Sequence, residues 1–87
     1  MLHTREIIRK LWDAQGYGNL AIWEDGSTEV VAPGSHPEKA GQPPLLVLKP
    51  LALVVGFPML DHALHDAGLL AAVEAAVRET GAEIVRE

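Results

Sequence analysis

The sequence predicts a single α+β domain in which helices cover mainly one face of a mixed sheet. Two apolar stretches on either side of Asp25-Gly26 are typical of a β-hairpin. Further along, an apolar run at Leu51–Val55, a helical pattern at Met59–Thr80 and an alternating segment at Glu83–Arg86 are typical of a C-terminal βαβ unit with parallel strands. The expected order is α-β-β-β(β)-α-α-β, in which an N-terminal helix plus β-hairpin precedes that unit.

Length and composition limit the classes of protein to consider. The chain has 87 residues, 48% hydrophobic and only 5% aromatic, so we expect one domain whose core is built from Leu, Val, Ile and Ala. The sequence contains no cysteine, which excludes disulfides, zinc–thiolate sites and thiol nucleophiles. No apolar stretch has the length of a membrane span, and no secretory signal is visible. These features predict a soluble, cytoplasmic protein.

The first predicted element is a helix that Thr4 caps and Gly16 ends. Glu6 favours the positive end of its dipole. Its apolar stripe consists of Ile7, Ile8, Leu11 and Trp12.

The hairpin strands are expected at Asn19–Glu24 and Thr28–Ala32, joined through Asp25-Gly26. Apolar side chains such as Ile22 and Trp23 alternate onto both faces of the first strand, which predicts that each face is at least partly covered.

A flexible loop is expected at Pro33–Pro44, which holds four prolines and two glycines and no periodic apolar pattern. Loops of this length inside small domains are uncommon and often functional. A simple connection between two edges of the sheet is an equally good interpretation.

Two strand-like runs follow the loop at Leu45–Leu48 and Leu51–Val55, and Pro50 between them indicates a bend, a bulge or an edge. Gly68 divides the helical segment into Met59–Asp66 and Leu69–Thr80, because glycine costs about 1 kcal/mol in a helix interior. The side chains expected to face the sheet are Leu60, Leu64, Leu69, Val73, Ala76 and Val77.

The strongest candidate for chemistry is a group of histidines and acids in the first of these helices. His62 and His65 are three residues apart, a spacing that suits two metal ligands, and Asp61 and Asp66 flank them. A complete site needs a further ligand that the spacing does not identify. The alternative interpretation is a pair of solvated histidines.

Ser35 and His36 place a hydroxyl nucleophile beside a base in the loop. Neighbouring residues seldom reach triad geometry, so these two are candidates for ligand contact and no catalytic residue is assigned.

The net charge is −5, and the only cluster of bases is Arg5, Arg9 and Lys10 in the first helix. Beyond residue 20 the chain carries ten acids against four bases. Nucleic acid is therefore an unfavoured partner, although this basic helix is where it would bind.

We expect a small, acidic, non-catalytic interaction or regulatory module that forms a homodimer or binds another protein, with no cofactor implied. The expectation of a dimer comes from the high apolar content of a chain that is too short to bury all of it. The first alternative is a metal-dependent hydrolase or nuclease that uses His62 and His65 with the nearby acids. The second is a nucleic-acid-binding regulator.

Overall fold

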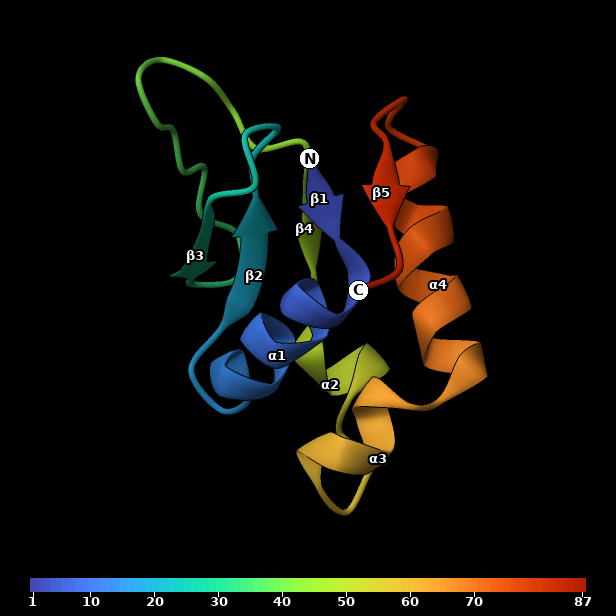
Figure 1. The fold of residues 1–87 in the computed structure, drawn as a ribbon. Helices are drawn as coiled ribbons and strands as arrows, with labels where there is room; N and C mark the ends of the chain where they lie inside the picture. The colour runs from blue at the N-terminus through green and yellow to red at the C-terminus, as the bar shows by residue number, and fades with distance from the viewer.

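The computed structural model describes residues 1–87 and confirms an α+β domain with both parallel and antiparallel strands (Figure 1). The elements are β1 (Leu2–His3), α1 (Thr4–Ala14), β2 (Asn19–Ile22), β3 (Thr28–Val31), β4 (Leu46–Leu48), α2 (Pro50–Leu53), α3 (Leu60–Leu64), α4 (Ala67–Arg78) and β5 (Ile84–Val85).

Helix α1 forms where it was predicted and occupies the centre of the molecule (Figure 1). It packs against β2 on one side and against α3 and α4 on the other, so Ile8 and Leu11 are completely buried. The prediction that Thr4 caps this helix is wrong. His3 is the N-cap, and Thr4 lies in the first turn, where its hydroxyl has partners from other elements.

The predicted hairpin is confirmed as the antiparallel pair β2–β3. Its connection is the three-residue loop Glu24–Gly26, in which Gly26 adopts a φ of 91° and the Trp23 amide donates to the Ser27 carbonyl. Strand β4 pairs with the other side of β2, which gives the order β3-β2-β4. Because β3 and β4 flank β2, the segment 33–44 must cross from one edge of the sheet to the other.

The prediction of a strand at Leu51–Val55 is wrong. Residues Pro50–Leu53 form the one-turn helix α2, and the Val54 amide donates to the Pro50 carbonyl at 2.9 Å. Proline suits this first helical position because its φ is already helical and its missing N–H would have had no partner there. The turn buries Pro50 and Val54.

The predicted C-terminal βαβ unit is not present, because its first strand does not form. The expected strand near Glu83–Arg86 does exist as β5, but it pairs in parallel with β1 through Leu2–Ile84 and His3–Val85. Parallel and antiparallel pairings therefore lie in two separate sheets.

The predicted pair of helices forms as α3 and α4, and they meet at His65–Asp66, close to Gly68 as predicted. Asp66 is the N-cap of α4, where its Oδ2 accepts a 2.8 Å hydrogen bond from the Leu69 amide. The side chains predicted to face inward belong to the core, although Leu60 and Ala76 are only half-buried. Helices α3 and α4 pack mainly on α1. No helix combines the length and the apolar character that crossing a bilayer requires.

Candidate functional site

The predicted histidine and aspartate cluster lies at the exposed end of the molecule formed by α3. The Nδ1 of His65 donates to the Asp61 carbonyl at 2.8 Å, and the Asp61 carboxylate lies 3.6 Å from the same nitrogen. Asp66 is engaged as the cap of α4, and His62 is exposed. No group of three or more His, Asp or Glu side chains in the structure is arranged to hold a metal ion.

Ser35 and His36 are exposed in the loop between β3 and β4. The Ser35 hydroxyl donates to the Ala32 carbonyl at 2.7 Å, and the Ser35 amide donates to the same oxygen at 3.1 Å. The hydroxyl proton is thus directed at the backbone, and no hydrogen bond joins Ser35 to His36.

The basic residues of α1 are divided between two roles. The Arg5 side chain is half-buried, and its Nε donates to the Leu64 carbonyl at 2.9 Å, which fastens α1 to the end of α3. Arg9 and Glu6 form a weak surface ion pair at 3.8 Å, and Lys10 is exposed. The basic surface available to an anionic partner therefore includes fewer side chains than the three that were predicted.

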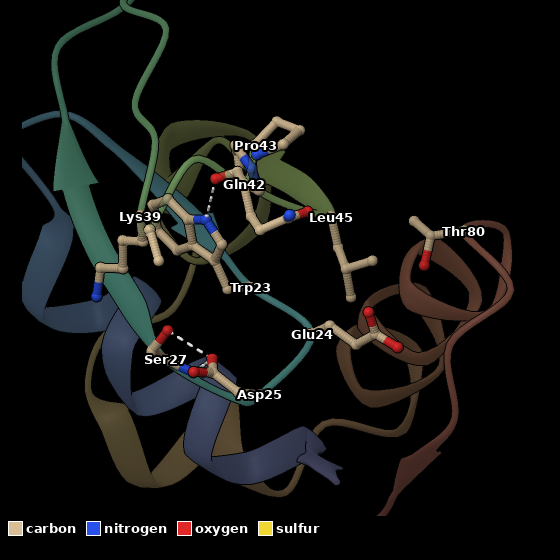
Figure 2. A pocket seen from close by; sticks show the side chains of 11 residues that line it. Trp23, Glu24, Asp25, Ser27, Lys39, Gln42, Pro43, Leu45 and Thr80 are labelled. Atoms are coloured by element: carbon tan, nitrogen blue, oxygen red, sulfur yellow. Dashed lines mark hydrogen bonds between the residues drawn. The ribbon is translucent and has the colours of Figure 1, made fainter.

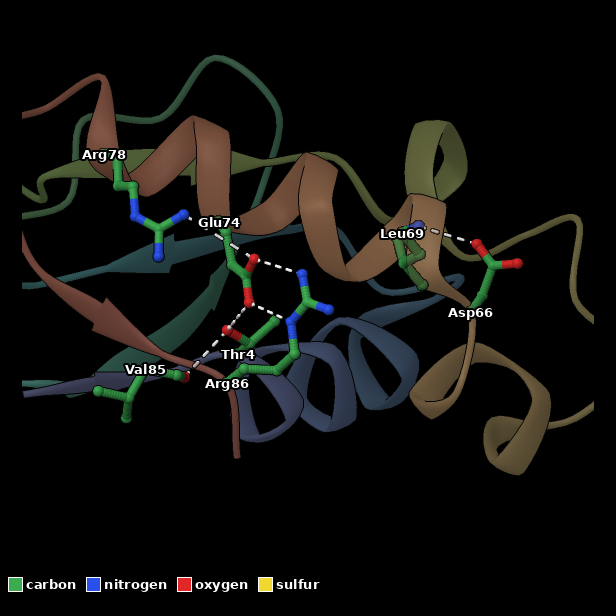
Figure 3. A network of polar contacts seen from close by, with 7 residues as sticks. All are labelled: Thr4, Asp66, Leu69, Glu74, Arg78, Val85 and Arg86. Carbon is green, nitrogen blue, oxygen red and sulfur yellow. Dashed lines mark hydrogen bonds and ion pairs between the residues drawn. The ribbon is translucent and has the colours of Figure 1, made fainter.

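A polar cluster that the sequence did not suggest joins α4 to the first turn of α1 and to the end of β5 (Figure 3). The guanidinium of Arg86 donates twice to the Glu74 carboxylate, from Nε and from Nη2, at 2.7 Å each. The Thr4 hydroxyl lies within hydrogen-bonding distance of Glu74 Oε2, at 3.1 Å, and of the Val85 carbonyl, at 3.0 Å. Arg78 completes the cluster at 3.9 Å from Glu74 Oε1.

The environment of Glu74 keeps its carboxylate ionised. Only 7% of the side chain is exposed, and burial alone would raise its pKa. The hydrogen bonds from Arg86 have the larger opposite effect and, with those from Thr4 and the nearby guanidinium charges, lower the pKa of Glu74 to about 2. No buried polar side-chain atom of the cluster lacks a hydrogen-bond partner, which is typical of a structural network.

The largest pocket, about 710 Å³, lies where the β2–β3 loop, the end of the 33–44 loop and the end of α4 meet (Figure 2). Trp23 forms its inner wall, and the indole Nε1 donates to the Gln42 carbonyl at 2.9 Å. The Lys39 ammonium lies 4.9 Å from the centre of the indole ring, a cation–π contact. The protein's own loop thus covers Trp23, which is only 4% exposed.

The rim of this Trp23 pocket carries charges of both signs. Glu24 and Asp25 come from the β2–β3 loop, and Lys39 comes from the opposite side. The Ser27 hydroxyl and amide both donate to Asp25 Oδ1, at 2.6 and 2.9 Å, and these bonds lower the pKa of Asp25. The Ser27 hydroxyl proton is thus directed at a carboxylate of its own turn.

A second pocket, of about 590 Å³, has a different character. It lies between the end of α1, the start of β2 and α2, and we call it the Tyr17 pocket. A Cβ on Gly18 would collide with the Val31 carbonyl oxygen, so only glycine allows the chain to approach β3 at this point. The residues that line it are Gly16, Tyr17, Gly18, Asn19, Pro33, Lys49, Leu51 and Ala52.

Comparison of the chain with protein-family models, with curated proteins and with solved structures found no match in any of the three.

Sequence reasoning missed the residues of both pockets and of the polar cluster. Tyr17 was given no role in the sequence analysis, and Leu51, which follows Lys49-Pro50, was assigned to a strand. The sequence did not single out Glu74 as a buried residue. In an amphipathic helix pattern, an acid that becomes buried cannot be distinguished from an acid that stays in solvent.

Proposed function

We propose that this protein is a non-catalytic interaction module that acts as a homodimer. The observation that carries the proposal is the exposure of three large apolar side chains in the short segment that links β4 to α3. Leu51, Val55 and Met59 are 70%, 58% and 53% exposed. We call these three residues the α2 ridge.

Burial of the α2 ridge against a second copy would supply a substantial driving force. Full burial of one such side chain contributes roughly 1.5–3 kcal/mol to the free energy of association. In a two-fold dimer the same residue is buried on both copies, so each residue contributes two buried side chains. The 9.4 kDa chain has few other ways to remove this surface from water, because its core is already filled around α1.

The two alternative functions have less support from the geometry. A metal-dependent hydrolase would use His62 and His65 with acids from the same helix, but Asp66 already caps α4. A nucleic-acid-binding regulator would need Arg5 free to reach phosphate, but its Nε donates to Leu64.

The test is sedimentation equilibrium across nanomolar to high micromolar concentrations. We expect twice the chain mass at micromolar concentration, and we expect Val55→Glu to shift the protein to a monomer because it places two carboxylates in the interface. Val47→Glu is the matched control, since Val47 is 43% exposed and lies on β4, outside the ridge.

A monomer at every concentration would contradict the proposed homodimer. A dimer that Val47→Glu disrupts and Val55→Glu does not would place the interface on the sheet, away from the ridge.

A further inference from the structure

The Tyr17 pocket differs from the other pockets in its charge. Four other pockets each include at least one acidic residue among those that line them. The Tyr17 pocket includes none, and its one charged residue is Lys49. In a chain of net charge −5, this is a local reversal of sign.

The polar side chains of the pocket have no partners within the protein. Lys49 forms no ion pair, and neither the Tyr17 hydroxyl nor the Asn19 side-chain amide takes part in a side-chain hydrogen bond of the fold. Tyr17 is 82% exposed, so its ring and hydroxyl are free to contact a ligand. One ammonium, one phenol and one amide therefore remain available at the same opening.

The remaining wall of the pocket is apolar. Pro33, Leu51 and Ala52 contribute hydrocarbon surface to its lining. The volume of about 590 Å³ is within the usual range for small-molecule sites, which combine mainly apolar walls with a few polar groups that orient the ligand.

We propose that the Tyr17 pocket binds a small free monocarboxylic acid with an aromatic or branched apolar body. The carboxylate pairs with the Lys49 ammonium, and the body lies between the Tyr17 ring and Leu51. A charge-assisted hydrogen bond of this kind discriminates against a neutral ligand of the same shape. Leu51 belongs both to this pocket and to the α2 ridge, whereas Lys49 and Tyr17, which carry the inference, lie outside the ridge.

Tyr17 is the single tyrosine of the chain, so its ring resonances report on the pocket without overlap from another tyrosine. We would label tyrosine with ¹³C and follow the ring signals by NMR during titration with phenylacetate. Phenylacetamide is the neutral probe of nearly the same shape. The dipeptide acetyl-Gly-Phe, with its free carboxyl end, tests whether a chain end is the preferred source of the carboxylate.

The variants distinguish the effect of the Lys49 charge on phenylacetate affinity from the effect of the protein's net charge. We expect Lys49→Gln to weaken phenylacetate binding about tenfold and Lys49→Arg to retain most of it. Lys10→Gln removes one positive charge from α1, outside the pocket, and should leave the affinity unchanged. Val55 is not among the residues that line the pocket, so phenylacetate binding by Val55→Glu reports on the ligand site when the dimer is lost.

The proposal is supported if phenylacetate gives saturable Tyr17 shifts, with an affinity at least tenfold higher than that of phenylacetamide and about tenfold higher than that of Lys49→Gln for phenylacetate. Equal affinity for the acid and the amide, or for the native protein and Lys49→Gln, would overturn it. Acetyl-Gly-Phe binding tenfold more tightly than phenylacetate would overturn the choice of a free small acid in favour of a peptide end.

Discussion

The Glu74 carboxylate and the Arg86 guanidinium form a two-pronged ion pair, with both hydrogen bonds at 2.7 Å, between the middle of α4 and the residue that follows β5. Two parallel hydrogen bonds of this kind fix the orientation of both groups as well as their distance. The pair therefore holds α4 against the end of β5, and it makes the stability of the fold dependent on pH.

The first prediction concerns Glu74→Gln. At pH 7 we expect this variant to lose about 2 kcal/mol of unfolding free energy, because it replaces charged hydrogen bonds with neutral ones at a buried position. The measurement is urea unfolding followed by circular dichroism. Glu79→Gln is the control, since Glu79 is an exposed acid just beyond the end of the same helix.

The pH dependence of that difference has a definite sign. The pKa of Glu74 is about 2 in the folded protein against an ordinary 4.5, so its contribution to stability is complete above pH 4.5 and is lost as the pH falls from 4.5 towards 2. The gap between the native protein and Glu74→Gln should narrow over that interval. A gap that stays constant from pH 6 to pH 2.5 would show that the carboxylate is not the titrating group.

The second prediction concerns the turn at Ala40-Gly41. Lys39 and Gln42 exchange two backbone hydrogen bonds, and the residues between them have φ angles of 50° and 77°, the left-handed pattern of a type I′ turn. Alanine is strained there and asparagine is favoured, so Ala40→Asn should raise the unfolding free energy by about 1 kcal/mol. Gly41→Ala should lower it by a similar amount. If thermal unfolding responds to neither change, the turn is not formed in solution.

The third prediction concerns the loop. We expect Pro33–Pro44 to be the most mobile internal segment, because Gly34–Glu38 has few hydrogen bonds and the prolines donate none. Limited trypsin digestion followed by mass spectrometry should show cleavage after Lys39 before cleavage after Lys10, which lies within α1. Equal protection at the two lysines would mean that the contact with Trp23 holds the loop closed.

The fourth prediction concerns the histidines. Changing His62 and His65 together to glutamine should alter stability by no more than about 0.5 kcal/mol for each, because both side chains are exposed. Zinc should leave the melting temperature of the native protein unchanged. A site specific to the folded state would instead add about 2.7 kcal/mol at a hundredfold excess over its dissociation constant. A zinc-dependent rise that the double variant abolishes would restore the hydrolase as the leading function.

Features set by nearby residues were predictable from the sequence. The β2–β3 hairpin follows from Asp25-Gly26 between two apolar stretches, and α1 follows from the spacing of Ile7, Ile8 and Leu11. The error at Leu51–Val55 also has a local cause. A short apolar run fits a buried strand or a helical turn equally well, and only the position of Pro50 favours the turn.

Features set by distant residues were not predictable. Strand β1 has only two residues and exists because β5 is beside it, and Glu74 is buried because Arg86 and Thr4 meet it there. The two pockets likewise form where separate elements converge, so no spacing along the chain reveals their lining. The predicted histidine pair was visible for the opposite reason, since its members are neighbours on one helix.

The parallel ladder between β1 and β5 also sets an order of events in folding. The Thr4 hydroxyl and the Val85 carbonyl that meet beside it are 81 residues apart in the chain, and closing a flexible loop of that length costs about 4 kcal/mol in entropy. The hydrogen bonds of a two-residue ladder offset little of this entropy cost, so the ladder is stable only after α1 and α4 have packed together. The ladder is therefore expected to form last and open first, so that exchange of the amides in β5 measures whether the native fold has been completed.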